Sequence, residues 1–267
     1  MYADLQTTVI HWDALADVGV TRDTIVENSK RVPGRFIPTT DIRAEQEPVA
    51  VCGYGPSLKQ TWKEVRNYKT IYTTSGAHKF LIDRGIIPTY HLESEPRGHK
   101  MHMLGDPHPD TVYLIASCIF PNYLDKLQAA NAKILLWHVM FQDQEAYEKT
   151  PKGEWIICGG DVAGPRTIRI ARLMGYTDIH CFGIDGDGKH AGPHTNEPPE
   201  DMYNPLVVRG ETFYITPTML HQIDVLFDFL DRNPEVHCTF HGDGLISRIA
   251  SRRPRKDKPK IPLAVMR

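Results

Sequence analysis

The five residues after the apolar run Val49–Cys52 have the composition of a phosphate-binding turn. They are Gly53, Tyr54, Gly55, Pro56 and Ser57. The two glycines permit positive φ angles and a close approach of the backbone to a ligand, and the proline suits a first helical turn. Because a helix N-terminus attracts anions, we expect this turn to bind a nucleotide phosphate. A turn without a ligand is the alternative, since a lone Gly-x-Gly is a short signal.

A second glycine turn, Gly159-Gly160-Asp161, precedes a predicted helix that carries Arg166 and Arg169. Two helix starts on one edge of a sheet would hold a diphosphate between them. The alternative is a plain strand-to-helix turn with both arginines on a solvated helix face.

The sequence Glu95-Pro96-Arg97 follows another apolar run. The Glu95 carboxylate is suited to accept hydrogen bonds from sugar hydroxyls, and the Arg97 guanidinium is suited to neutralise a phosphate. A turn with a surface ion pair is the alternative.

Asp185 and Asp187 lie in the sequence Asp-Gly-Asp-Gly at the end of a further apolar run. Flanking glycines would let both carboxylates reach a ligand or a Mg²⁺ ion, which prefers oxygen ligands. The segment is too short for an EF-hand, and an Asp-Gly turn without a ligand is the alternative.

His190 and His194 follow closely, separated by a Gly-Pro pair that argues against the helix a zinc-binding histidine pair needs. A histidine has a reference pKa of about 6.5, so either residue is suited to act as a general base beside the aspartates. The segment 190–205 is predicted to form a lid over the site, although such a loop can also be inert.

Alternating apolar runs and helical patterns must position these residues. The predicted strands are Val49–Cys52, 70–73, 89–92, 112–116, 134–139, 155–158 and 179–184, and the predicted helices are 21–30, 58–67, 78–84, 122–130 and 163–174. This alternation predicts an α/β, Rossmann-like, mostly parallel sheet with helices on both faces. Ligands of such sheets bind outside the carboxyl ends of the strands, where all the polar clusters above are expected.

The composition is that of an ordinary globular protein, with 267 residues and 41% hydrophobic content. No apolar run approaches the roughly 20 residues of a membrane span, and the N-terminal segment carries acidic residues rather than a signal pattern. We therefore expect a cytoplasmic protein without membrane contact. The five cysteines have no C-x-x-C spacing, which predicts buried thiols rather than a zinc site.

Three regions are predicted: an N-terminal extension over 1–46, the transferase domain over 47–247 and a basic tail over 248–267. The tail gathers six positive residues and one negative residue between Arg252 and Lys260, whereas the whole chain has a net charge of −2. This charge suits either nucleic-acid binding or a solvated terminus.

On these motifs the chain resembles the DUF115 or MptE-like family, which includes 6-hydroxymethylpterin diphosphokinases and the central domain of motility accessory factors, and more distantly the CMP-sialic-acid sialyltransferases. The likeness rests on the sequences 53–58, 85–88, 95–97, 159–160 and 182–185. Relatives tend to have Asp-Pro-Arg where this chain has Glu95-Pro96-Arg97. The resemblance implies nucleotide use and leaves the acceptor open.

The expected function is that of a nucleotide-dependent transferase, first of all a glycosyltransferase acting on a hydroxyl of a small molecule, a glycan or a DNA base. The donor is a nucleotide sugar, no cofactor is covalently bound, and a UDP- or GDP-sugar would recruit Mg²⁺ at Asp185 and Asp187. One alternative is an MptE-like diphosphokinase that uses ATP, and another is a nucleotide- or nucleic-acid-binding module without turnover. The oligomeric state is left open.

Overall fold

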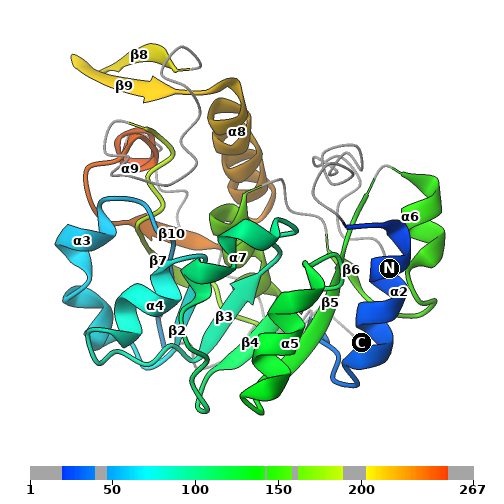
Figure 1. Cartoon of the computed structure of the whole chain (residues 1–267). Coiled ribbons are helices and arrows are strands. Elements are labelled where there is room, and N and C mark those ends of the chain that lie inside the picture. The colour runs from blue at the N-terminus through cyan, green and yellow to red at the C-terminus, as the bar shows by residue number, and fades with distance from the viewer. Residues whose placement is uncertain (1–19, 40–46, 142, 158–161, 189–202, 252–267) are drawn as a thin grey trace, which may run out of the picture.

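Eight parallel strands form the central sheet of the computed structural model, which describes residues 20–39, 47–141, 143–157, 162–188 and 203–251 (Figure 1). In spatial order the strands are β10 (His237–Phe240), β7 (Asp178–Phe182), β1 (Val49–Cys52), β2 (Ile71–Thr74), β3 (Tyr90–Glu93), β4 (Val112–Ala116), β5 (Lys133–Val139) and β6 (Ile156–Ile157). The predicted Rossmann-like class is confirmed.

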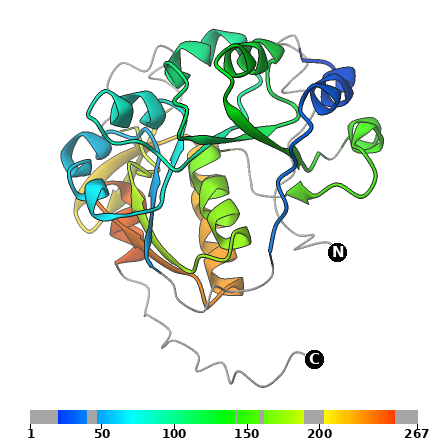
Figure 2. The same cartoon turned by 90° about the horizontal axis from the view of Figure 1, so that it is seen from below.

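Helices cover both faces of this sheet. Helices α4 (Ala77–Ile82) and α5 (Pro121–Ala129) lie on one face, and α7 (Ala163–Leu173) and α8 (Pro217–Arg232) lie on the other (Figure 2). The remaining helices are α2 (Arg22–Arg31), α3 (Leu58–Thr61), α6 (Gln144–Lys149), α9 (Leu245–Ala250) and the 3₁₀ segments η1 (Glu64–Asn67) and η2 (Gly98–Leu104). No helix in the described part of the chain is long and apolar enough to span a membrane.

The apolar strand β1 is buried because it feeds two cores. Val49 and Val51 pack with residues of α7 and α8, while Ala50 and Cys52 pack with Leu58 of α3 on the opposite face. Successive side chains of a strand point to opposite faces, so a continuous apolar run is what a sheet covered on both sides requires.

The strand order reverses at β1. From β1 the chain proceeds through β2 to β6 in one direction, and β7 then pairs with the other side of β1, with Cys52 opposite Phe182. In open parallel sheets a crevice forms at such a reversal, outside the carboxyl ends of the strands. The ends of β1 and β7 are therefore the place for a ligand.

Part of the segment before the sheet also packs into the fold. Ile25 of α2 is fully buried in the larger core, and Arg35 pairs in parallel with Leu136 of β5. Helix α2 lies near α5 and α6 at the β6 end of the sheet (Figure 2).

The predicted helix 58–67 is wrong as one element. It divides into α3 and η1, because the chain keeps helical dihedral angles at Trp62 and Lys63 but tightens to i→i+3 bonding, with Val65 N–H donating to the Trp62 carbonyl.

The sequence analysis also missed a hairpin beyond the sheet. Strands β8 (Asn204–Val208) and β9 (Glu211–Ile215) are antiparallel and joined by Arg209 and Gly210, both with positive φ. Two positive φ angles define a tight hairpin turn, but arginine seldom adopts the first position, so the signal was weak.

Candidate active site

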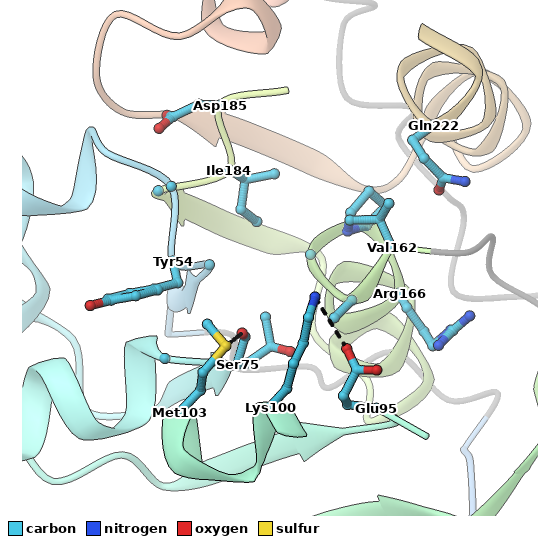
Figure 3. Close-up of a pocket in the computed structure, with 18 of the residues that line it drawn as sticks. Tyr54, Ser75, Glu95, Lys100, Met103, Val162, Arg166, Ile184, Asp185 and Gln222 are labelled. Carbon is cyan, nitrogen blue, oxygen red and sulfur yellow. Dashed lines mark hydrogen bonds and ion pairs between the residues drawn. The ribbon is translucent and has the colours of Figure 1, made fainter. Parts of the chain in front are cut away.

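A cavity of about 1060 Å³ opens at the carboxyl ends of β1, β2, β3 and β7, where the strand order reverses. Figure 3 shows side chains from the segment after β3 and from η2, α7 and α8 around it. Most of the polar clusters expected at this edge meet here. The lining residues include Gly53, Tyr54, Gly55, Pro56, Glu95, Arg97, Asp185 and Asp187.

Ser57 differs from the other residues of its turn because it does not line the cavity. It is 2% exposed, its backbone N–H donates to Asp185 Oδ2 at 2.9 Å, and its hydroxyl donates to Asp185 Oδ1. The anion that these donors hold is thus the protein's own carboxylate.

The two glycines of this turn are needed for close approach and not for unusual dihedral angles. Neither has a positive φ, contrary to expectation. A Cβ on Gly53 would lie 2.6 Å from the Gly183 carbonyl oxygen, and one on Gly55 would lie 2.5 Å from Asp185 Oδ2. The positive φ belongs to Gly183 in the facing turn after β7. The turns after β1 and β7 therefore press directly against each other.

Asp185 and Asp187 both line the cavity and are both buried, at 5% and 7% exposure. Besides the bonds from Ser57 to Asp185, the backbone N–H of Leu245 donates to Asp187 Oδ2 at 2.9 Å. Among the described residues, no three His, Cys, Asp or Glu side chains gather closely enough to hold a metal ion. Mg²⁺ at the two aspartates stays a prediction.

Glu93 is a cavity residue to which the sequence analysis assigned no role. It ends β3, is 4% exposed, and accepts hydrogen bonds from the backbone N–H groups of Ser94 and Glu95 at 2.9 and 3.0 Å. Burial, together with the negative charge of Glu95, raises the pKa of Glu93 to about 7. The side chain can therefore hold or release a proton near neutral pH. Its only sequence signal was the end of an apolar strand.

Glu95 lies between two cations. Arg97 donates to it through Nε at 2.5 Å and through a terminal nitrogen at 2.8 Å, and Lys100 Nζ of η2 lies 3.6 Å from its Oε2 (Figure 3 draws Glu95 and Lys100). Burial opposes ionisation of Glu95, but the two cations outweigh it and hold its pKa below the usual value. Burial lowers the pKa of Lys100, an effect that Glu95 opposes. One carboxylate shared by two cations leaves positive charge for an anionic ligand.

Helix α7 brings a buried arginine to the cavity. Arg166 is 2% exposed, donates to Ser94 Oγ at 2.8 Å and lies 5.7 Å from the ring centroid of Trp137. Arg169 is also buried, and donates to the Val225 carbonyl. The alternative of a solvated arginine face is therefore wrong.

Several predicted site residues lie outside the described residues: Gly159, Gly160, Asp161, His190 and His194. The structure does place the start of α7, just after the second glycine turn, at the cavity, where Val162, Ala163 and Gly164 line it.

Comparison with known proteins bears on the fold and the family. A family model described as 6-hydroxymethylpterin diphosphokinase MptE-like matches residues 23–188. No curated protein matches the chain.

Among solved structures, the MAf glycosyltransferase from Magnetospirillum magneticum AMB-1 is similar with a TM-score of 0.60 and 16% identity, over 84% of this chain and 37% of that one. This chain thus spans little more than a third of that protein. A mammalian sialyltransferase has a TM-score of 0.45 and 14% identity, over 81% of this chain and 77% of the other. At such identities the likeness to the first structure shows a shared fold.

Proposed function

Because the chain belongs to the 6-hydroxymethylpterin diphosphokinase MptE-like family, we propose that it is a nucleotide-dependent transferase, and that it transfers a sugar from a nucleotide sugar to a hydroxyl acceptor. One observation carries the proposal. The close-packed turn after β1, the start of α7 and the cations around Glu95 all line one cavity at the reversal of the strand order.

The cavity suits such a donor in size and charge. Its volume of about 1060 Å³ is at the upper end of the roughly 300–1,000 Å³ of small-molecule sites. Arg97 and Lys100 are placed to neutralise phosphate charge, and the backbone at Gly53 and Gly55 lets the donor approach closely. The fold shared with a glycosyltransferase supports sugar transfer as the first choice.

In the proposed reaction the acceptor oxygen forms a bond to the anomeric carbon, and the bond from that carbon to the phosphate oxygen breaks. The nucleotide leaves with the electron pair of the broken bond, where Arg97 and Lys100 stabilise its charge. His190 or His194 takes the proton of the acceptor hydroxyl. If the donor is a UDP- or GDP-sugar, Mg²⁺ held by Asp185 and Asp187 would add further positive charge at the leaving phosphate.

A diphosphokinase is the second candidate, favoured by the description of the family. That enzyme would use ATP and release AMP. The two candidates are distinguished by incubating the protein with CMP-, UDP- and GDP-sugars and with ATP, and by identifying the released nucleotide by mass spectrometry. Release of CMP, UDP or GDP supports sugar transfer, and release of AMP supports the second candidate. If no nucleotide is released, the chain is a binding module.

The general base is tested by replacing His190 and His194 separately with alanine. The base acts in the transition state, so its loss lowers kcat by about 10²- to 10⁴-fold and leaves donor affinity unchanged. A loss of affinity with unchanged kcat would make the histidine a donor ligand instead.

The acceptor is a hydroxyl of a small molecule, a glycan or DNA. The basic tail is the feature that suits DNA, and deletion of residues 252–267 would then weaken DNA binding much more at low salt than at high salt. If full-length and truncated proteins bind DNA equally, DNA is not the acceptor.

A further inference from the structure

A buried amide lies at the cavity wall without the hydrogen bonds it needs. Gln222 of α8 lines the cavity and is only 4% exposed, yet within the described part of the chain neither its Nε2 nor its Oε1 has a hydrogen-bond partner. Native proteins pair nearly all such groups, and each unpaired one weakens the fold. Gln222 therefore has two hydrogen-bonding atoms that the fold does not use.

Thr74, at the end of β2, shows the same property. It lines the cavity and is 2% exposed, and its Oγ1 has no partner among the described residues. Thr73, one residue earlier, is equally buried but lies within hydrogen-bonding distance of His91 Nδ1, at 3.1 Å, and of the Tyr90 carbonyl, at 3.3 Å. Only the threonine at the cavity is left unpaired.

Several apolar side chains line the same cavity as Gln222. Met219, three residues earlier and so on the same face of α8, lines the cavity together with Ile223 and with Ile184 and Ile246. In Figure 3, Gln222 extends from α8 at the upper right, whereas Lys100 and Glu95 rise from below. The cationic part of the cavity suits phosphate, and the part near Gln222 suits a flat, uncharged group with polar atoms at its edge.

We propose that Gln222 and Thr74 contact the ligand, and that Gln222 recognises an uncharged group that offers both an N–H donor and a hydrogen-bond acceptor. The inference rests on the proposed function, because a nucleotide sugar offers such a group in two places, on a pyrimidine base and on an N-acylamino group of the sugar. The long side chain of glutamine can turn its amide toward the entering ligand. Helix α8 lies beyond residues 23–188, so this contact is outside the segment matched by the family model.

The first test compares stability in three variants of similar shape. Gln222→Met and Thr74→Val remove polar atoms without partners, so the urea midpoint stays unchanged or rises. Thr73→Val removes a satisfied hydroxyl, so its midpoint falls. If the urea midpoint of Gln222→Met or Thr74→Val falls as far as that of Thr73→Val, the replaced side chain has a structural partner and the proposal is rejected.

The second test titrates wild type and Gln222→Met with UMP, CMP, ribose 5-phosphate, UDP-glucose and UDP-N-acetylglucosamine by calorimetry. A tenfold or greater loss of affinity for UMP or CMP, but not for ribose 5-phosphate, supports contact of Gln222 with the base. The same loss for UDP-N-acetylglucosamine alone supports the N-acyl group.

The proposal is rejected if the variant binds every probe as the wild type does, or if it loses affinity equally for all of them. Those outcomes leave the proposed function standing, because the wild type still binds. A wild type that binds no probe also rejects this inference, and leaves a GDP-sugar as the donor to test for the proposed function.

Discussion

Two acidic pairs of the same spacing line the cavity and have different roles. Asp185 and Asp187 follow β7, and Glu93 and Glu95 lie at the end of β3. The aspartates accept hydrogen bonds from distant parts of the chain, since Ser57 and Leu245 donate to them. Among the described residues, the hydrogen bonds to the glutamates come from nearby positions: the backbone N–H groups of Ser94 and Glu95 donate to Glu93, and Arg97 donates to Glu95. Lys100 adds an ion pair with Glu95.

This difference teaches that sequence spacing does not determine the role of a carboxylate. Its role depends on the hydrogen-bond donors and cations that the fold brings near it. Through these hydrogen bonds the aspartates connect the end of β7 with the turn after β1 and with the start of α9. Their carboxylates therefore help to stabilise the fold. The Glu95 carboxylate holds two cations at the cavity, where a ligand can compete for them.

The largest expected effect tests how tightly the aspartate side is packed. In Gly55→Val the new Cβ would lie 2.5 Å from Asp185 Oδ2 and 2.7 Å from the Gly183 carbonyl, so we expect the free energy of unfolding to fall by about 3 kcal/mol or more. Gly164→Ala is the control, because its Cβ would meet Ile184 at an ordinary 3.4 Å and alanine favours the helix. Urea denaturation measures both, and equal stability of the two variants would contradict this packing.

The next effect compares the two acidic pairs directly. Asp185→Ala leaves the buried donors of Ser57 without an acceptor, and we expect a loss of about 2–3 kcal/mol in the free energy of unfolding. Glu95→Ala removes the ion-pair partner of Arg97 and Lys100. Because these cations are partly exposed to water, we expect the free energy of unfolding to fall by less than about 1 kcal/mol. A larger loss in Glu95→Ala than in Asp185→Ala would reverse the assignment of the two sides.

The third expected effect concerns pH. Burial raises the pKa of Glu93 to about 7 in the folded state, above the roughly 4.3 of an unfolded glutamate, so the folded state binds more protons between these values. The titration of Glu93 therefore lowers the stability of the wild type as pH rises from about 4.5 to 7.

Glu93→Gln removes this titration. The difference in unfolding free energy between wild type and Glu93→Gln should therefore shift in favour of the variant as pH rises across that window. A difference that does not change with pH would show that Glu93 has an ordinary pKa.

The sequence predicted much of the sheet because strands such as β1 and β4 are apolar over most of their length. The predicted strand 112–116 coincides with β4. A buried parallel strand can be predicted from its apolar composition alone, without knowing which strands it pairs with. The placement of polar residues after these strands then followed from the common direction of the strands.

The site residues that were missed depend on contacts between distant elements. Glu93, Lys100, Thr74 and Gln222 stand out only through burial, charge neighbours or the lack of a partner, none of which has a local signature. The role of Ser57 was also hidden, because its acceptor Asp185 lies 128 positions further along the chain. Spacing within a motif cannot reveal a hydrogen bond of that range.

The central claim is that the cations around Glu95 form the ligand side of the cavity. Its most direct test is the dissociation constant of the nucleotides UMP, CMP and GMP, measured by calorimetry for wild type, Arg97→Ala and the control Lys69→Ala. The Lys69 cation is exposed and paired with Glu47 outside the cavity. A charged hydrogen bond contributes about 1.5–3 kcal/mol, so Arg97→Ala should bind about 10- to 100-fold more weakly, and Lys69→Ala as the wild type does. Unchanged affinity in Arg97→Ala would contradict the account.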